Sequence, residues 1–103
     1  RARETHMNEA KFDNVIHAPS RLQICAILAE LAEVDFQQLK QQLNVSDSVL
    51  SKHLKSLEET GYIFILKKLD KGRVRTWLSL TDTGHTAFNA HVLALRAIID
   101  KSK

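Results

Sequence analysis

Apolar residues recur at helical spacing through the first sixty positions, and the polar residues between these runs mark where each helix begins. Proline disfavours helical geometry in the residue before it, so Ala18 ends one helix and Pro19 opens the next. Asp35 and Ser46 precede two further runs and carry the short oxygen-bearing side chains that cap helix N-termini. The pattern predicts four helices, over residues 8–17, 20–33, 36–43 and 47–60.

The spacing of apolar residues changes after Gly61, which is suited to end a helix. Residues 62–66 and 74–80 are rich in β-branched and aromatic residues, as strands are. Residues 70–73 between them read Asp-Lys-Gly-Arg, a turn in which glycine can supply a positive φ. These features predict a β-hairpin.

A last helix is predicted over residues 82–100, with Thr81 as its cap and Gly84 as a weak point in its first turn. The element order is therefore four helices, a hairpin and a helix. A short helix, a tight turn and a longer helix followed by a hairpin form a winged helix-turn-helix. We expect a mainly α fold with a small β-hairpin (α+β), in which residues 8–103 form one domain.

The length of 103 residues, with 44% apolar and 26% charged content, fits a single globular domain. We expect residues 1–6 to be a remnant of a fusion ahead of a natural start at Met7. No apolar run approaches the roughly 20 residues needed to cross a bilayer. No signal peptide opens the chain, so we expect no membrane association and a cytoplasmic location.

Candidate chemistry is sparse. Cys25 is the only cysteine, which excludes an internal disulfide, and its apolar helical setting favours a core residue over a redox or metal role. The sequence contains no glycine-rich phosphate loop, no HExxH motif and no credible catalytic triad. We therefore expect a protein that is not an enzyme and needs no cofactor.

Positive charge is concentrated in one third of the chain, although the net charge is only +3. Seven basic and three acidic residues lie between Lys52 and Arg75. Such asymmetry indicates a polyanionic partner, and the alternative is an ordinary solvated surface.

The helix that follows Ser46 is expected to turn Val49, Leu50, Leu54 and Leu57 inward, which leaves a polar outer face. An α-helix fits the major groove of B-DNA, where its N-terminal residues reach base edges and its lysines reach phosphates. His53 fits a half-buried packing residue and a phosphate contact equally well. The candidate DNA contacts in this region are Ser46, Asp47, Ser48, Ser51, Lys52 and Lys55.

The predicted hairpin carries a second group of basic residues around its glycine turn. Arg73 is expected to reach deepest, because arginine suits narrow minor grooves. Strand alternation means that only some of these residues can contact DNA, and Phe64 and Trp77 are expected in the core rather than stacked on bases. The candidate DNA contacts of the wing are Lys71, Arg73 and Arg75, with Lys67 and Lys68 beside them.

Three stretches together resemble the ArsR and MarR superfamilies of bacterial regulators. Residues 43–63, LNVSDSVLSKHLKSLEETGYI, resemble their recognition helix and its exit toward the wing. Residues 19–22, PSRL, resemble their helix opening, and residues 80–84, LTDTG, resemble the MarR segment after the wing. The resemblance covers nearly all of the chain after Met7. It implies a transcriptional regulator, with repression favoured, that binds double-stranded DNA sequence-specifically.

The rival interpretation is a winged helix that serves as a protein–protein interaction module without its own DNA specificity. An acidic or apolar recognition face would favour that rival. The basic charge on both the predicted recognition helix and the predicted wing argues against it.

The terminal helices are expected to form a homodimer. Apolar residues of the last helix are spaced four, three and four apart, as in a heptad seam, and the first helix offers a second apolar stripe. A domain of this size has little core to occupy both stripes, and a dimer would supply two half-site readers. The predicted interface residues are Phe12, Ile16, Phe88, Val92, Leu95 and Ile99.

The resemblance also raises the question of an effector, since ArsR proteins often sense metals and MarR proteins often bind small organic ligands. Asp82, His85 and His91 lie on the last helix, but the two histidines are six apart and face different sides. We therefore expect no metal site, with a site shared across a dimer left open. An unidentified small-molecule effector also stays open.

Overall fold

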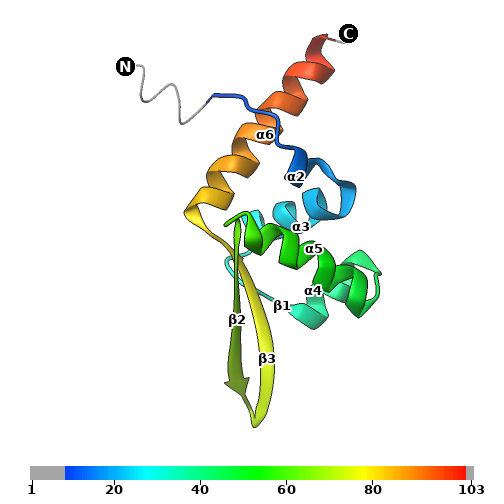
Figure 1. Cartoon of the computed structure of the whole chain (residues 1–103), viewed down its shortest axis with the longest axis vertical. Helices are drawn as coiled ribbons and strands as arrows, with labels where there is room; N and C mark the ends of the chain where they lie inside the picture. Colours follow the sequence, from blue (N-terminus) through cyan, green and yellow to red (C-terminus); the bar gives the residue numbers. More distant parts are fainter. Residues whose placement is uncertain (1–8, 102–103) are drawn as a thin grey trace.

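Helices pack around one end of a three-stranded antiparallel sheet in the computed structural model, which describes residues 9–101 (Figure 1). The expected fusion remnant and the start at Met7 lie outside the described residues. No helix in residues 9–101 is both long enough and apolar enough to span a membrane. The elements are α2 (Asn14–His17), α3 (Pro19–Glu30), β1 (Val34–Asp35), α4 (Phe36–Leu43), α5 (Asp47–Glu59), β2 (Ile63–Asp70), β3 (Arg73–Leu80) and α6 (Asp82–Lys101).

The hairpin is confirmed, and the sheet has one strand more than the sequence predicted. Strand order is β1-β3-β2, with β1 paired to β3 through Val34 opposite Leu78 and Asp35 opposite Trp77. β2 is longer than predicted, because its pairing with β3 continues through the basic stretch as far as Asp70 opposite Arg73. The two strands therefore project as a wing beyond the body (Figure 1).

One apolar cluster joins the helices to the base of this sheet. Leu50, Leu54 and Leu57 line the inner side of α5, at the spacing of one helical face. Cys25 belongs to the same cluster and has no exposed surface, and burial, aided by the negative charge of Asp13, raises the pKa of its thiol to about 12. The interpretation of Cys25 as a core residue is therefore confirmed.

The N-terminal helix is shorter than predicted, because among the described residues it begins only at Asn14. Asp13 precedes it in extended conformation and caps it by accepting a hydrogen bond from the Ile16 amide at 3.0 Å. The chain before Asp13 is tied to α6 instead, through a bond from the Lys11 amide to the Ala90 carbonyl. α2 therefore serves as a short bridge between α6 and the body.

Gly84 was expected to weaken α6, but in the structure it is the residue that lets the first turn of α6 pack closely against the backbone of Tyr62. A Cβ atom built on Gly84 would lie 2.1 Å from the backbone oxygen of Tyr62. That oxygen accepts a hydrogen bond from the Thr81 amide, and the Thr81 hydroxyl caps α6 by accepting from the Gly84 amide. Glycine therefore allows α6 to start directly against the exit of α5.

The wing and the last turns of α6 project from opposite ends of the helical body (Figure 1). The body between them presents α5, so the elements predicted to bind DNA and the helix predicted to pair two chains are spatially separated. The residues predicted to contact DNA and those predicted to form the dimer interface therefore lie on different parts of the molecule.

Candidate nucleic-acid interface

The turn between α4 and α5 is fixed by backbone geometry and a side-chain cap. Asn44 ends α4 in the left-handed region, with a φ of 55°, which asparagine tolerates better than most residues. Ser46 is extended, and its hydroxyl accepts the Val49 amide at 3.2 Å. The predicted Ser46 cap is confirmed. Asp35 occupies the N-cap position of α4 as predicted, but its side chain makes no capping hydrogen bond.

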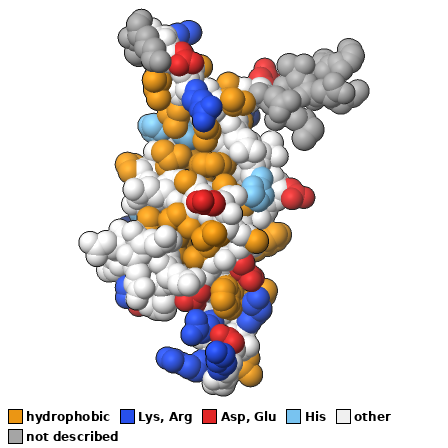
Figure 2. Space-filling view, turned by 180° about the vertical axis from the view of Figure 1, so that it is seen from behind, with side chains coloured by type: hydrophobic (Ala, Val, Ile, Leu, Met, Phe, Trp, Pro, Cys, Tyr) orange, Lys and Arg blue, Asp and Glu red, His pale blue; other side chains and the backbone are white. Residues whose placement is uncertain are grey.

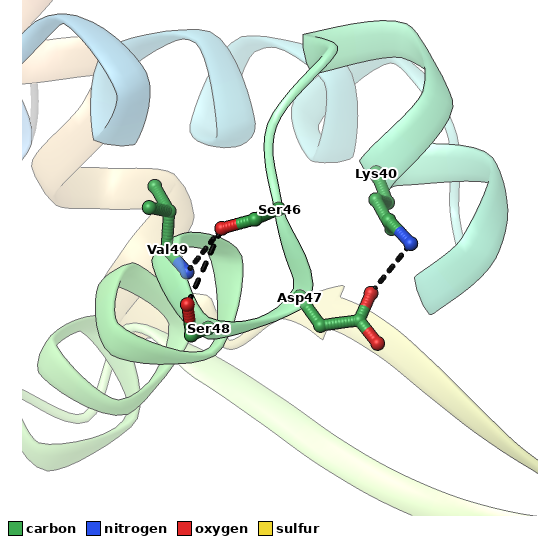
Figure 3. A network of polar contacts seen from close by, with 5 residues as sticks. All are labelled: Lys40, Ser46, Asp47, Ser48 and Val49. Carbon is green, nitrogen blue, oxygen red and sulfur yellow. Dashed lines mark hydrogen bonds and ion pairs between the residues drawn. The ribbon is translucent and has the colours of Figure 1, made fainter.

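Asp47 connects the two helices of this motif rather than standing alone at the start of α5. Its carboxylate lies 2.7 Å from the Lys40 ammonium of α4 (Figure 3). Both side chains are partly exposed, so the pair contributes little to stability, but it orients the Asp47 carboxylate toward α4. Figure 3 also shows Ser48 beside Ser46, with their hydroxyl oxygens 3.3 Å apart.

The outer face of α5 is polar and accessible. Ser48, Ser51, Lys52 and Lys55 are all exposed, as the sequence predicted, while the leucines one face away are buried. Val49 was expected to face inward, and that expectation is wrong, because the residue is 42% exposed. A single apolar side chain therefore stands among the serines and lysines of the first two turns.

His53 lies half-buried on the flank of α5 that faces α3. Its Nδ1 atom is 3.3 Å from Nη1 of Arg21, whose Nε donates to the Val15 carbonyl. Burial, then the charges of Arg21 and Lys52, lowers the pKa of His53. A neutral ring held by Arg21 fits the packing interpretation, since it connects α5 to α3.

The tip of the wing is a two-residue turn. Lys71 and Gly72 both have positive φ, 53° and 80°, as a hairpin turn of this length requires. Lys67 and Arg73 are exposed on the flanking strands, and neither forms an ion pair with any described residue. Seen from behind in Figure 2, lysine and arginine side chains gather at this end of the molecule.

Two basic side chains of the wing are already occupied within the chain. Arg75 contacts the carboxylate of Asp35 at 3.6 Å and that of Asp70 at 3.3 Å. Lys68 contacts Glu33 at 3.1 Å, and its ammonium lies 5.1 Å from the centre of the Trp77 ring. Asp35 is almost fully buried, so Arg75 neutralises its charge and ties the wing to β1.

The hairpin also exposes apolar side chains that the sequence did not place there. Phe64 was expected in the core, but it is 61% exposed, so that prediction is wrong. Trp77, opposite Leu66 in the sheet, is half-buried. Leu69 and Val74 face each other near the tip and are the most exposed apolar residues described.

One of the six residues predicted for the dimer interface is buried inside its own domain. Ile16 has no exposed surface and belongs to the core of its own domain, so it cannot contact a partner and its assignment to the interface is corrected. Phe88 packs against the same core and keeps part of its surface exposed. Val92 and Leu95 are half-buried, while Ile99 is 58% exposed on the projecting end of α6.

The histidines of α6 do not meet at a common site. His91 is fully buried, and its Nδ1 accepts the Asp13 amide at 2.9 Å, so Nε2 carries the proton. The rings of Phe12 and His17 lie 4.8 Å and 5.4 Å from its ring. His85 is exposed. Within residues 9–101, no three His, Cys, Asp or Glu side chains are grouped to hold a metal ion.

A groove of about 460 Å³ lies between the N-terminal segment and the first turns of α6. Its lining includes Lys11, Asp13, Tyr62, Asp82 and Thr86. The Tyr62 hydroxyl donates to the Asp13 carboxylate, and burial together with this bond raises the tyrosine pKa to about 12. The groove therefore adjoins Tyr62, which lies between the end of α5 and the start of β2.

Residues 20–99 match the family described as the winged helix DNA-binding domain. Uncharacterized protein MJ0432 of Methanocaldococcus jannaschii is 37% identical over 78 residues, which cover 76% of this chain and 85% of that protein.

Two solved structures share the fold. The transcriptional regulator homologue of Pyrococcus horikoshii OT3 has a TM-score of 0.84 at 23% identity, covering 100% of this chain and 99% of that one. FabT of Streptococcus pneumoniae, solved in complex with DNA, has a TM-score of 0.67 at 22% identity, covering 97% of this chain and 68% of that one.

Proposed function

The chain belongs to the family of winged helix DNA-binding domains. We propose that it is a transcriptional regulator in which α5 reads the major groove while the wing contacts the adjacent backbone or minor groove. One observation carries this assignment of surfaces. The outer face of α5 exposes Ser48, Ser51, Lys52 and Lys55 directly behind a capped helix N-terminus. Serine and lysine side chains there can donate to phosphates and to base acceptors.

Electrostatics supports the same orientation. The N-terminal end of α5 presents backbone amides and the positive end of the helix dipole, which favour a phosphate. Lys52 and Lys55 add two charges one turn further along. Asp47, although it was a candidate contact, holds Lys40, so we assign it to positioning the motif.

The wing adds a second contact through Lys67, Lys71 and Arg73, whose charges are not paired with described residues. The positive φ of Lys71 and Gly72 makes the tip narrow enough to follow a groove. Arg75 is reassigned from DNA contact to fixing the wing against β1, because Asp35 and Asp70 occupy its guanidinium.

We further propose that two copies associate through α6. Val92, Leu95 and Ile99 continue along the end of the helix that projects from the body, where Leu93 and Ile98 are also 40% and 52% exposed. Covering such a surface is favourable, and a two-fold dimer would present two copies of α5 to an inverted repeat. Phe12, which is exposed and whose ring lies beside that of His91, and the partly exposed Phe88 would extend this surface toward the body.

The regulator acts in the cytoplasm, through binding rather than catalysis, and repression by occupying an operator is the simplest mode.

An effector would be best placed in the groove beside Tyr62. A ligand that displaces the Asp13 carboxylate would break its bond to the Tyr62 hydroxyl and so alter the contacts of the segment that follows α5. A candidate effector that binds there should raise the melting temperature of the parent protein but not that of Tyr62→Phe.

The experiment that tests the function is selection of bound duplexes from a random pool, at low and then physiological salt. Salt-sensitive binding that enriches an inverted repeat supports a dimeric operator-binding regulator. Enrichment of a single, non-repeated site would contradict the dimer. An absence of DNA binding even at low salt would contradict the assignment and favour a protein–protein interaction module.

A further inference from the structure

Val49 is exposed on α5 although its side chain is apolar, so packing in the core does not explain why a valine is found at this position. The buried stripe of the helix consists of Leu50, Leu54 and Leu57. Val49 keeps 42% of its surface exposed. Helix propensity does not account for it either, since β-branched residues lose side-chain freedom in a helix.

The signals that start α5 also leave Val49 unexplained. In a hydrophobic staple the residue before the N-cap packs against the fourth helical residue. Those positions here are Val45, which packs against the core cluster, and Leu50, which belongs to it. Val49 is the third helical residue, where a capping box places Glu or Gln to bond back to the N-cap amide. Valine cannot make that bond, so the position forgoes a stabilising contact.

We infer that Val49 reads the C5 methyl group of a thymine in the major groove, an inference that rests on the proposed role of α5. The first turn of a recognition helix is the part that reaches base edges. Each base pair presents donors and acceptors in the major groove, but only thymine presents a methyl group there. An exposed apolar side chain among hydroxyls is the complement of that group.

The local geometry makes Val49 a rigid reader. Its amide is held by the Ser46 hydroxyl at 3.2 Å, which fixes the backbone that carries the side chain (Figure 3). Its branched side chain has one strongly preferred χ1 rotamer in a helix. Ser48 and Ser51, which are exposed on the same two turns of α5, can bond to polar groups of neighbouring bases. Serine alone reads bases permissively, so Val49 supplies discrimination that the hydroxyls lack.

The test replaces single thymines of a selected duplex by deoxyuridine, which removes only the methyl group. For the unmodified protein we expect one thymine in each half-site at which this loss weakens binding about fourfold, the effect of burying one methyl group. Val49→Ala removes the contact in both protomers, so it should bind the thymine duplex about sixteenfold more weakly, about fourfold for each half-site, and lose the response to deoxyuridine. Melting curves would establish that the variant is folded, as an exposed position predicts.

Val74→Ala is the matched control, because it makes the same change at an exposed valine of the wing. The minor groove carries no thymine methyl group, so this variant should keep the full response to deoxyuridine. The inference is overturned if no deoxyuridine position matters, if Val49→Ala responds as the unmodified protein does, or if the selected half-site contains no thymine. Failure to select any duplex would instead overturn the proposed function on which it rests.

Discussion

Replacing Gly84 by alanine should destabilise the fold, although the same change in the middle of a helix normally stabilises it. Alanine favours helix over glycine by up to about 1 kcal/mol. Against this gain, the new Cβ would lie 2.1 Å from the Tyr62 oxygen and 2.9 Å from its carbonyl carbon. The neighbour is backbone, so relief requires a shift of about 1 Å in a packed region, an overpacking that typically costs 1–3 kcal/mol.

The net expectation is a loss of about 2 kcal/mol, because the shift also disturbs the bonds that Thr81 makes to Tyr62 and Gly84. For a domain of this size the melting temperature should fall by about 10 °C. Thermal unfolding is measured at one protein concentration, since association would raise stability. Asn89→Ala, at an exposed position of the same helix, is the control and should be neutral or slightly stabilising. A Gly84→Ala protein that melts at or above the parent temperature would refute the close-approach argument.

Three further outcomes are expected. Arg75→Ala leaves the buried Asp35 carboxylate without its cation and should lower the free energy of urea unfolding by about 1–2 kcal/mol. The double-mutant cycle with Asp35→Ala should give a coupling energy of at least about 0.5 kcal/mol. Additive losses would contradict an ion pair that connects the wing to β1. Leu95→Glu places a charge in the proposed seam and should sediment as a monomer, whereas a persistent dimer would move the interface elsewhere. Burial, with His17 as the lesser cause, lowers the pKa of His91, so stability should be full above pH 6.5 and decline as the pH falls below it, where the unfolded chain binds a proton first. His91→Gln should flatten that decline, and an unchanged slope would assign it to another group.

Local signals sufficed for the helix-turn-helix. The α4 span and the start of α5 follow from apolar spacing and from the Ser46 cap, whose partner is only three residues away. The turn of the wing follows likewise from Lys71 and Gly72, where glycine supplies a positive φ. These features depend on neighbours in the chain, so the sequence carries them directly.

Features that depend on distant partners could not be predicted. β1 is two residues long and exists only because Val34 pairs with Leu78. In the sequence Arg75 is one more basic residue of the wing. Its ion pair with Asp35 depends on the pairing of β1 with β3, which the sequence did not predict.

The exposure of apolar residues was the other limit. Val49 and Phe64 have the hydrophobicity of core residues, but no other element of the described chain covers them fully. Ile16 shows the reverse error, since its helix is short and points into the domain rather than away from it. Spacing identifies a face of a helix, but not what covers that face.

The salt dependence of binding to the selected duplex tests the central claim most directly. Lys52→Ala/Lys55→Ala should reduce the slope of log K against log salt by about one for each lysine in each protomer. Lys11→Ala/Lys101→Ala makes the same change in net charge on the terminal segments and serves as the matched control. If α5 lies against DNA, the slope should be shallower for the first variant and nearly unchanged for the second. Equal slopes in the parent and both variants would contradict the placement of α5 against DNA.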